Sequence, residues 1–155
     1  MEELEEGEPG ELTLENASRK ARAVAVPGSG EAVIACDTVV SLDGRIYGKP
    51  GDMEAARETL QALAGRTHEV TSGLVVMTAG EERTAIARTE VSFRAMGRRM
   101  LAWYLDTGEW RERAGGYAIQ GAGAALVRHI QGEYENVVGL PVASLLDVYP
   151  QLLSG

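Results

Sequence analysis

Apolar and polar positions alternate with two different periods along the chain, and these periods predict an ordered series of helices and strands. The pattern predicts helices over 12–25, 53–64, 100–106 and 142–153, where apolar residues recur on one helical face. Apolar and β-branched runs predict strands over Val33–Leu42, Arg45–Tyr47, 68–78, 83–94 and 124–130. This order indicates an α/β fold with a mixed central sheet flanked by helices, as a single domain over residues 1–155.

Turn and cap residues predict where several of these elements begin and end. Asp43-Gly44 suits the two-residue turn of a hairpin. Asp52 is a good N-cap for the helix that follows it, and Gly65 is placed to end that helix. Pro150 is expected to kink or fray the last helix. The acidic, glycine- and proline-containing stretch 1–10 predicts a solvated loop.

Asp37 stands out because it interrupts an otherwise apolar, β-branched strand at its centre. Val33–Leu42 has the composition of a strand that is buried on both faces. Burying a carboxylate without a partner costs several kcal/mol, so the position needs a cation, a metal or a chemical role. A structural alternative stays open, in which Asp37 lies at a strand edge and caps a neighbouring helix or turn.

Composition and charge narrow the classes of partner. A formal net charge of −8 argues against broad binding to nucleic acid or anionic membranes, although a small phosphate pocket remains compatible with it. The one cysteine, Cys36, cannot form an internal disulfide and fits a packing role in a reducing compartment. No apolar run approaches the length of a membrane span. We therefore expect a cytoplasmic protein without nucleic-acid or membrane partners.

Carboxylates and lysines near glycine-rich turns suggest chemistry on a phosphate-bearing ligand. Lys49 follows the hairpin, Lys20 projects from the first helix, and acidic residues including Glu3 lie near the start. Such groups suit a metal-bound polyphosphate, because a divalent cation and ammonium groups together balance its negative charge. The alternatives are exposed surface lysines, a solubilising acidic run, and a Gln120 that only completes a turn.

Five blocks, in the same order along the chain, resemble the Maf family. They are Cys36-Asp37-Thr38-Val39-Val40, Gly48-Lys49-Pro50, Gly65-Arg66-Thr67-His68-Glu69-Val70, Ala114-Gly115-Gly116-Tyr117-Ala118-Ile119-Gln120-Gly121 and Tyr134-Glu135-Asn136-Val137-Val138-Gly139-Leu140-Pro141. The resemblance implies a nucleoside triphosphate pyrophosphatase that releases pyrophosphate and leaves a nucleoside monophosphate. It also implies a divalent metal (Mg²⁺ or Mn²⁺), a cytoplasmic setting and a homodimer as one assembly. The fold it implies is similar to that of inosine triphosphate pyrophosphatases.

The resemblance also assigns roles in binding phosphate and metal. Asp37 matches the family's proton acceptor, which activates the attacking water. Lys20 and Lys49 match phosphate-binding lysines. Glu3 aligns with an acidic pair ahead of the first helix, and together with Asp37 it is the expected metal ligand.

Base choice is the second property that the resemblance assigns. Thr38 and Gln120 match positions associated with the base, and their identities resemble the branch that acts on dTTP, UTP or modified pyrimidine nucleotides. An amide at Gln120 can both donate and accept a hydrogen bond at a pyrimidine edge. Arg113 stands where many members have lysine, which keeps the charge and changes its geometry.

The chain departs from the family pattern at its start. The family begins with a strand and a Ser-x-Ser-Pro-Arg-Arg loop, whereas Met1 here lies almost at the acidic pair, so the fold is expected to be N-terminally shortened. One explanation is a true start upstream of Met1. The other is a shortened member that is catalytically weak or inactive, with a nucleotide-binding or division-regulating role.

Overall fold

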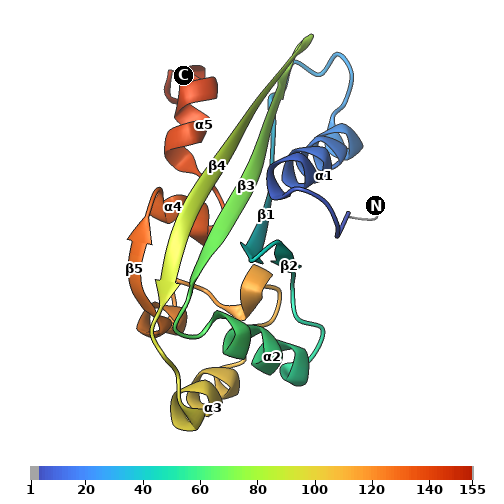
Figure 1. The fold of residues 1–155 in the computed structure, drawn as a ribbon. Helices are drawn as coiled ribbons and strands as arrows, with labels where there is room; N and C mark the ends of the chain where they lie inside the picture. Colours follow the sequence, from blue (N-terminus) through green and yellow to red (C-terminus); the bar gives the residue numbers. More distant parts are fainter. Residues whose placement is uncertain (1–3, 155) are drawn as a thin grey trace.

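Residues 4–154, which the structure (a computed structural model) describes, form a five-stranded sheet in the order β2-β1-β3-β4-β5. The strands are β1 (Val33–Leu42), β2 (Arg45–Tyr47), β3 (Thr67–Thr78), β4 (Glu81–Phe93) and β5 (Val127–Gln131). The helices are α1 (Pro9–Val24), α2 (Met53–Leu63), α3 (Arg98–Asp106), α4 (Tyr134–Val138) and α5 (Val142–Val148), with short 3₁₀ helices at Ala114–Gly116, Ala122–Leu126 and Pro150–Leu153. Figure 1 follows these elements along the chain.

The α/β class is confirmed, but the strand directions differ from the mixed sheet that we expected. All four strand pairings among the described residues are antiparallel. Two of them are tight hairpins, closed at Asp43-Gly44 and at Ala79-Gly80, and a hairpin can only join antiparallel strands. The other two pairings follow crossovers that carry helices and bring the chain back in the opposite direction.

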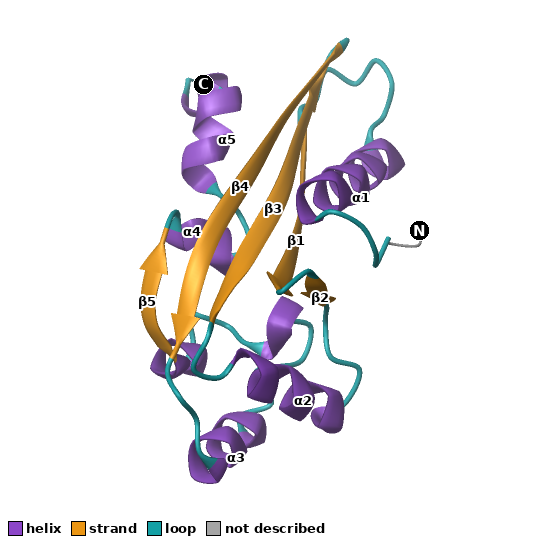
Figure 2. Ribbon diagram, viewed as in Figure 1, coloured by secondary structure: helices purple, strands orange, loops and turns teal. Residues whose placement is uncertain are grey.

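Helix α1 covers one face of the sheet, against β1 and β3 (Figure 2). Its small residues Ala17 and Ala21 pack on Val75. The helix begins at Pro9, three residues before the expected start, and this corrects the interpretation of 1–10 as entirely a loop. The Glu8 side chain caps the first turn and proline is tolerated there, because its missing N–H needs no partner at that position.

The opposite face carries α4 and α5 (Figure 1). Leu145 of α5 packs on Leu74 and Val76 of β3. The sequence pattern did not predict α4, and it predicted one helix over 142–153. Helix α5 instead ends at Val148, and Pro150 starts a separate 3₁₀ turn, as expected of a proline that cannot continue the helix.

The main hydrophobic core lies at the end of the sheet where α2 and α3 pack (Figure 1). Leu60, Phe93 and Tyr104 are buried there together with residues of the 114–126 segment. The expected strand over 124–130 starts only at Val127, because a 3₁₀ turn occupies Ala122–Leu126. No helix in the described part of the chain is long and apolar enough to cross a membrane.

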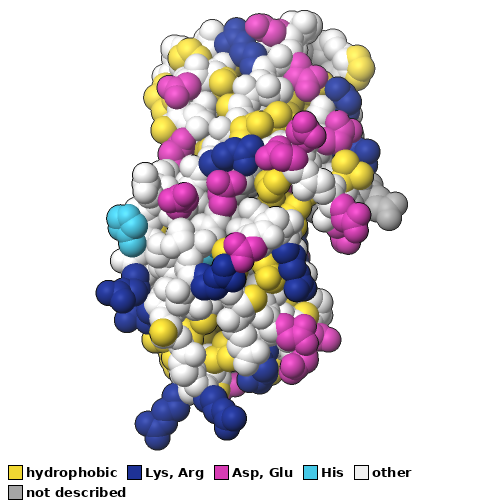
Figure 3. All heavy atoms as spheres, viewed as in Figure 1, with side chains coloured by type: hydrophobic (Ala, Val, Ile, Leu, Met, Phe, Trp, Pro, Cys, Tyr) yellow, Lys and Arg dark blue, Asp and Glu magenta, His cyan; other side chains and the backbone are white. Residues whose placement is uncertain are grey.

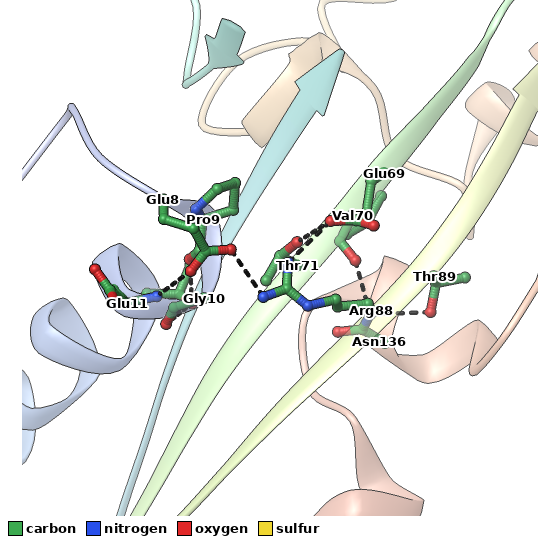
Figure 4. A network of polar contacts seen from close by, with 11 residues as sticks. Glu8, Pro9, Gly10, Glu11, Glu69, Val70, Thr71, Arg88, Thr89 and Asn136 are labelled. Atoms are coloured by element: carbon green, nitrogen blue, oxygen red, sulfur yellow. Dashed lines mark hydrogen bonds and ion pairs between the residues drawn. The ribbon is translucent and has the colours of Figure 1, made fainter. Parts of the chain in front are cut away.

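Polar contacts tie both layers of helices to the sheet. Figure 4 shows Arg88 of β4 reaching Glu8, at 2.8 Å from Nη2 to Oε1, and Glu69, at 3.1 Å from Nη1 to Oε1. The same view shows Asn136 of α4 beside Thr89. On the face drawn in Figure 3, basic side chains lie among acidic ones across the sheet.

Candidate active site

Two adjoining hollows, of about 190 and 370 Å³, lie beside β1 and share Asp37, Thr38, Lys49 and Ala114 in their walls. The smaller hollow is also lined by Lys20 and Gln120. Of the site residues predicted from the sequence, all those that the structure describes therefore lie in one cleft. Glu3, the remaining one, lies outside the described residues.

Asp37 lies at the centre of this cleft with its carboxylate fixed by two side chains of α1. It is 8% exposed, and Lys20 Nζ lies 3.1 Å from its Oδ1. Asn16 Nδ2 donates to Oδ2 over 3.1 Å. A carboxylate has about four acceptor positions, so these two contacts leave others for water or substrate. Asp37 is therefore held by side-chain partners. Among the described residues its carboxylate does not cap a helix or a turn, which was the structural alternative.

Helix α1 reaches Asp37 because a glycine lets it approach the sheet closely. Gly73 of β3 is the register partner of Asp37. A Cβ on Gly73 would lie less than 3.0 Å from backbone atoms of Thr13 and Leu14. Asn16 and Lys20 are one helical turn apart, so they project from the same face of α1 onto Asp37.

Thr38 faces the opposite side of the sheet, because successive side chains of a strand alternate. Its hydroxyl lies 2.7 Å from Ser72 Oγ. Among the described residues, β2 pairs with β1 only over Val40–Leu42, so no strand covers the edge of β1 beside Asp37 and Thr38. The cleft can therefore reach both faces of the sheet around this edge.

The far wall of the cleft comes from the 112–120 segment. Gln120 is exposed and follows buried Ile119, which makes its side chain available to a ligand. Arg113 also lines the cleft, so cations from three separate segments line the hollow that contains Asp37. Glu112 lines the same hollow with a backbone φ of 60°, a conformation that residues other than glycine rarely adopt. The combination of several cations with few carboxylates suits a polyanionic ligand.

The residues present also fit a magnesium ion bound together with phosphate. The described residues contain no cluster of three or more histidine, cysteine or acidic side chains that could hold a metal by themselves. Mg²⁺ does not need one, because it commonly binds through one or two carboxylates, substrate phosphates and water. Asp37 supplies one carboxylate, and Glu5 lines the larger hollow with it.

Sequence reasoning missed two polar partners of the predicted residues. Asn16 is buried on the apolar face of α1, and its polarity at such a position was the available signal. Ser72 is the register partner of Thr38, which only the strand pairing reveals. Cys36 packs at the edge of the cluster around Leu74, and burial raises the pKa of its thiol, which favours a packing role.

Comparison with known proteins agrees with these observations. Residues 1–152 match the family model described as Maf-like protein. A protein of Pyrococcus furiosus named dTTP/UTP pyrophosphatase is 43% identical over 145 residues, which cover 94% of this chain and 76% of the relative. A protein of Bacillus cytotoxicus with the same name is 43% identical over 147 residues, which cover 95% of this chain and 77% of the relative. The chain belongs to the Maf-like protein family.

Proposed function

We propose that this protein is a nucleoside triphosphate pyrophosphatase that acts on dTTP, UTP or modified pyrimidine nucleotides. The observation that carries the proposal is the Asp37 carboxylate, held between Lys20 and Asn16 in a cleft that also presents Lys49. The names of the relatives in Pyrococcus furiosus and Bacillus cytotoxicus support the same activity.

Hydrolysis between the α- and β-phosphates needs an activated water and a balanced leaving group. In the proposed reaction Asp37 accepts a proton from water, and the water oxygen bonds to the α-phosphorus. The bond from that phosphorus to the bridging oxygen breaks, so pyrophosphate leaves and the nucleoside monophosphate remains. Lys20 and Lys49 bind the phosphate oxygens, and their fixed positive charge stabilises the negative charge that develops on them.

A divalent metal, Mg²⁺ or Mn²⁺, is the expected cofactor. Asp37 and Glu3 would hold it, with substrate oxygens completing its coordination. When bound, such an ion supplies Lewis-acid polarisation of the phosphoryl oxygens.

Base choice is proposed to rest on Thr38 and Gln120. Uracil and thymine present a carbonyl acceptor next to a ring N–H donor, and a carboxamide matches this pair with one donor and one acceptor. Thr38 lies on the side of the sheet away from α1, so the base and the phosphates would occupy different parts of the cleft. We further propose a cytoplasmic protein that forms homodimers and has no nucleic-acid or membrane partner.

The test is pyrophosphate release from dTTP and UTP by the chain and by Asp37→Asn, with Mg²⁺ or Mn²⁺. Asparagine keeps the size of the side chain but cannot accept the proton at neutral pH. General-base catalysis is typically worth 10²–10⁴-fold, so we expect kcat to fall by roughly that factor in the variant.

Asp106→Asn is the matched control, because Asp106 is exposed at the end of α3, away from the residues that line the cleft. Its kcat should equal that of the unmodified chain. Release that survives unchanged in Asp37→Asn would reject Asp37 as the base. Nucleotide binding without any release by the unmodified chain would favour a binding protein instead.

A further inference from the structure

Glu109, which follows α3, binds the segment that carries Gln120 but does not itself line the cleft. Its Oε2 accepts a hydrogen bond from the Ala122 N–H over 2.9 Å. Its Oε1 accepts from the Gly123 N–H over 2.9 Å and from the Tyr104 hydroxyl over 2.9 Å. Two main-chain amides just after Gln120 are therefore anchored on one carboxylate.

Tyr104 extends this anchor to the residues before Gln120. Its side chain is fully buried, and its hydroxyl accepts a hydrogen bond from the Ala118 N–H over 3.0 Å while donating to Glu109. The backbone on both sides of Gln120 is thus tied to the same pair of side chains. Gly121 fits closely against this pair, since a Cβ there would lie less than 3.0 Å from the Glu109 carboxylate.

The Glu109 carboxylate is suited to remain ionised in this position. Burial alone would raise its pKa. The hydrogen bonds that the carboxylate accepts together lower the pKa by more, so the pKa lies below its ordinary value. An ionised carboxylate only accepts hydrogen bonds, which matches three donors pointing at it.

Selection between bases depends on where this segment is held. Cytosine carries an amino donor where uracil has a carbonyl acceptor. A carboxamide can present either pattern by rotating about its last bond, so Gln120 discriminates only if neighbouring groups hold its amide in one orientation, and the main chain of 118–123 can supply such groups only while its own position is fixed.

We propose that Glu109, supported by Tyr104, is a positioning residue that sets base selectivity by fixing the backbone around Gln120. The proposal rests on the proposed function, because it assigns a structural origin to the pyrimidine preference of the same cleft. Neither side chain touches the substrate. Both act through the main chain of residues 118–123.

The experiment compares Glu109→Gln and Tyr104→Phe with the unmodified chain, using UTP, dTTP, CTP and GTP. Glutamine places an amide donor against main-chain donors, and phenylalanine removes one hydroxyl while the ring stays in the core. Losing a well-placed hydrogen bond to the base costs about 1–1.5 kcal/mol, so the ratio of kcat/KM for UTP to that for CTP should fall about tenfold. The change should lie mainly in KM for UTP and dTTP.

A merely structural role would lower kcat/KM for all four nucleotides together and leave their ratio unchanged, which would overturn the proposal. Glu58→Gln, an exposed glutamate on α2, is the matched control and should change neither quantity. Thermal unfolding of each variant identifies those that fold poorly, and Glu109→Asp, which restores the carboxylate, should recover part of the ratio.

Binding of the corresponding α,β-methylene analogues distinguishes a failure of the proposed function from a failure of the positioning role of Glu109. If the unmodified chain binds these analogues without hydrolysing triphosphates, the proposed function fails, and the ratio of Kd values for uracil and cytosine analogues then decides the role of Glu109. Hydrolysis with an unaltered ratio in both variants rejects the positioning role alone. If the chain binds no nucleotide, both proposals are wrong.

Discussion

At the scale of single residues, His68 shows how a buried titratable group can support the floor of the cleft. It is 2% exposed, and its Nε2 lies 2.7 Å from the hydroxyl of Tyr117, which lines the cleft. Phe93 and Tyr117 pack edge-on against the ring, at centroid distances of 4.8 and 5.4 Å. Burial lowers the pKa of His68 to about 4, so the imidazole is neutral at physiological pH.

We predict that His68 makes the protein less stable as the pH falls from about 6.5 to about 4. In this range the unfolded chain binds a proton at His68 and the folded protein does not. The shift from 6.5 to about 4 corresponds to about 3 kcal/mol of unfolding free energy, present above pH 6.5 and lost by pH 4. Urea unfolding at a series of pH values measures this loss.

His68→Gln is the comparison for that experiment, because glutamine can bond to Tyr117 and does not titrate. The difference in unfolding free energy between the two proteins should shrink as the pH falls, while all other titrating groups cancel. A constant difference between pH 7 and pH 4 would contradict the prediction.

Some residues of the site could be predicted from the sequence and others could not, depending on whether the residue type and its position alone indicate a partner. Asp37 was conspicuous because an acidic residue in a buried strand needs a partner. Its second partner, Asn16, was not predicted, because a polar residue on a helix face does not reveal what lies opposite. Glu109 was missed for the same reason, since two of its three donors are main-chain groups of a segment that contacts it only after folding.

At the scale of secondary structure elements, the close approach of α1 to the sheet at Gly73 determines the geometry around Asp37. Thr13 and Leu14 cross β3 at this glycine, and the next turns of α1 present Asn16 and Lys20 to the carboxylate. A larger residue at 73 would push the helix away, because the obstructing atoms are backbone. The position therefore links packing directly to the chemistry of the cleft.

We predict that Gly73→Ala lowers both stability and activity. Overpacking of this kind typically costs about 1–3 kcal/mol, since the helix must move to admit the methyl group. The movement also separates Lys20 from Asp37, so kcat/KM should fall even at a temperature where the variant is fully folded. Urea unfolding and pyrophosphate release measure the two effects separately.

Gly51→Ala provides the control, because a Cβ on Gly51 meets no atom within 4 Å. It should leave both measurements near those of the unmodified chain. Equal behaviour of the two variants would show that the contact at Gly73 does not limit the position of α1.

Element boundaries were predictable where local turn chemistry decides them, and less so elsewhere. The hairpin β1–β2 has the expected limits, because Asp43-Gly44 specifies its turn. Helix α1 starts early because the Glu8 cap and Pro9 together define a first turn. Strand direction was not predictable from the local pattern, since it depends on which strands meet after the crossovers.

At the scale of the whole molecule, the cleft exists only when distant parts of the chain are assembled. Its walls come from α1, from β1, from the 112–120 segment and from α4. One buried amide side chain fastens each helix: Asn16 bonds to Asp37, and Asn136 Nδ2 donates to the Val70 carbonyl oxygen over 3.1 Å. The two helices lie on opposite faces of the sheet, so the cleft is held from both sides (Figure 2).

The last prediction follows from the position of Asn136 at the junction of α4 with β3 and β4. It is fully buried, and its Nδ2 also donates to Thr89 Oγ1 over 3.0 Å. Asn136→Ala removes both bonds inside the protein, so we expect a loss of about 1–3 kcal/mol in unfolding free energy. Because Val137, Val138 and Gly139 follow directly and line the cleft, KM for UTP should rise while kcat changes less. Glu135→Ala is the control, because Glu135 is an exposed neighbour on α4, and it should change neither the unfolding free energy nor KM. A stability loss in Asn136→Ala with unaltered KM would show that α4 stabilises the fold without shaping the cleft.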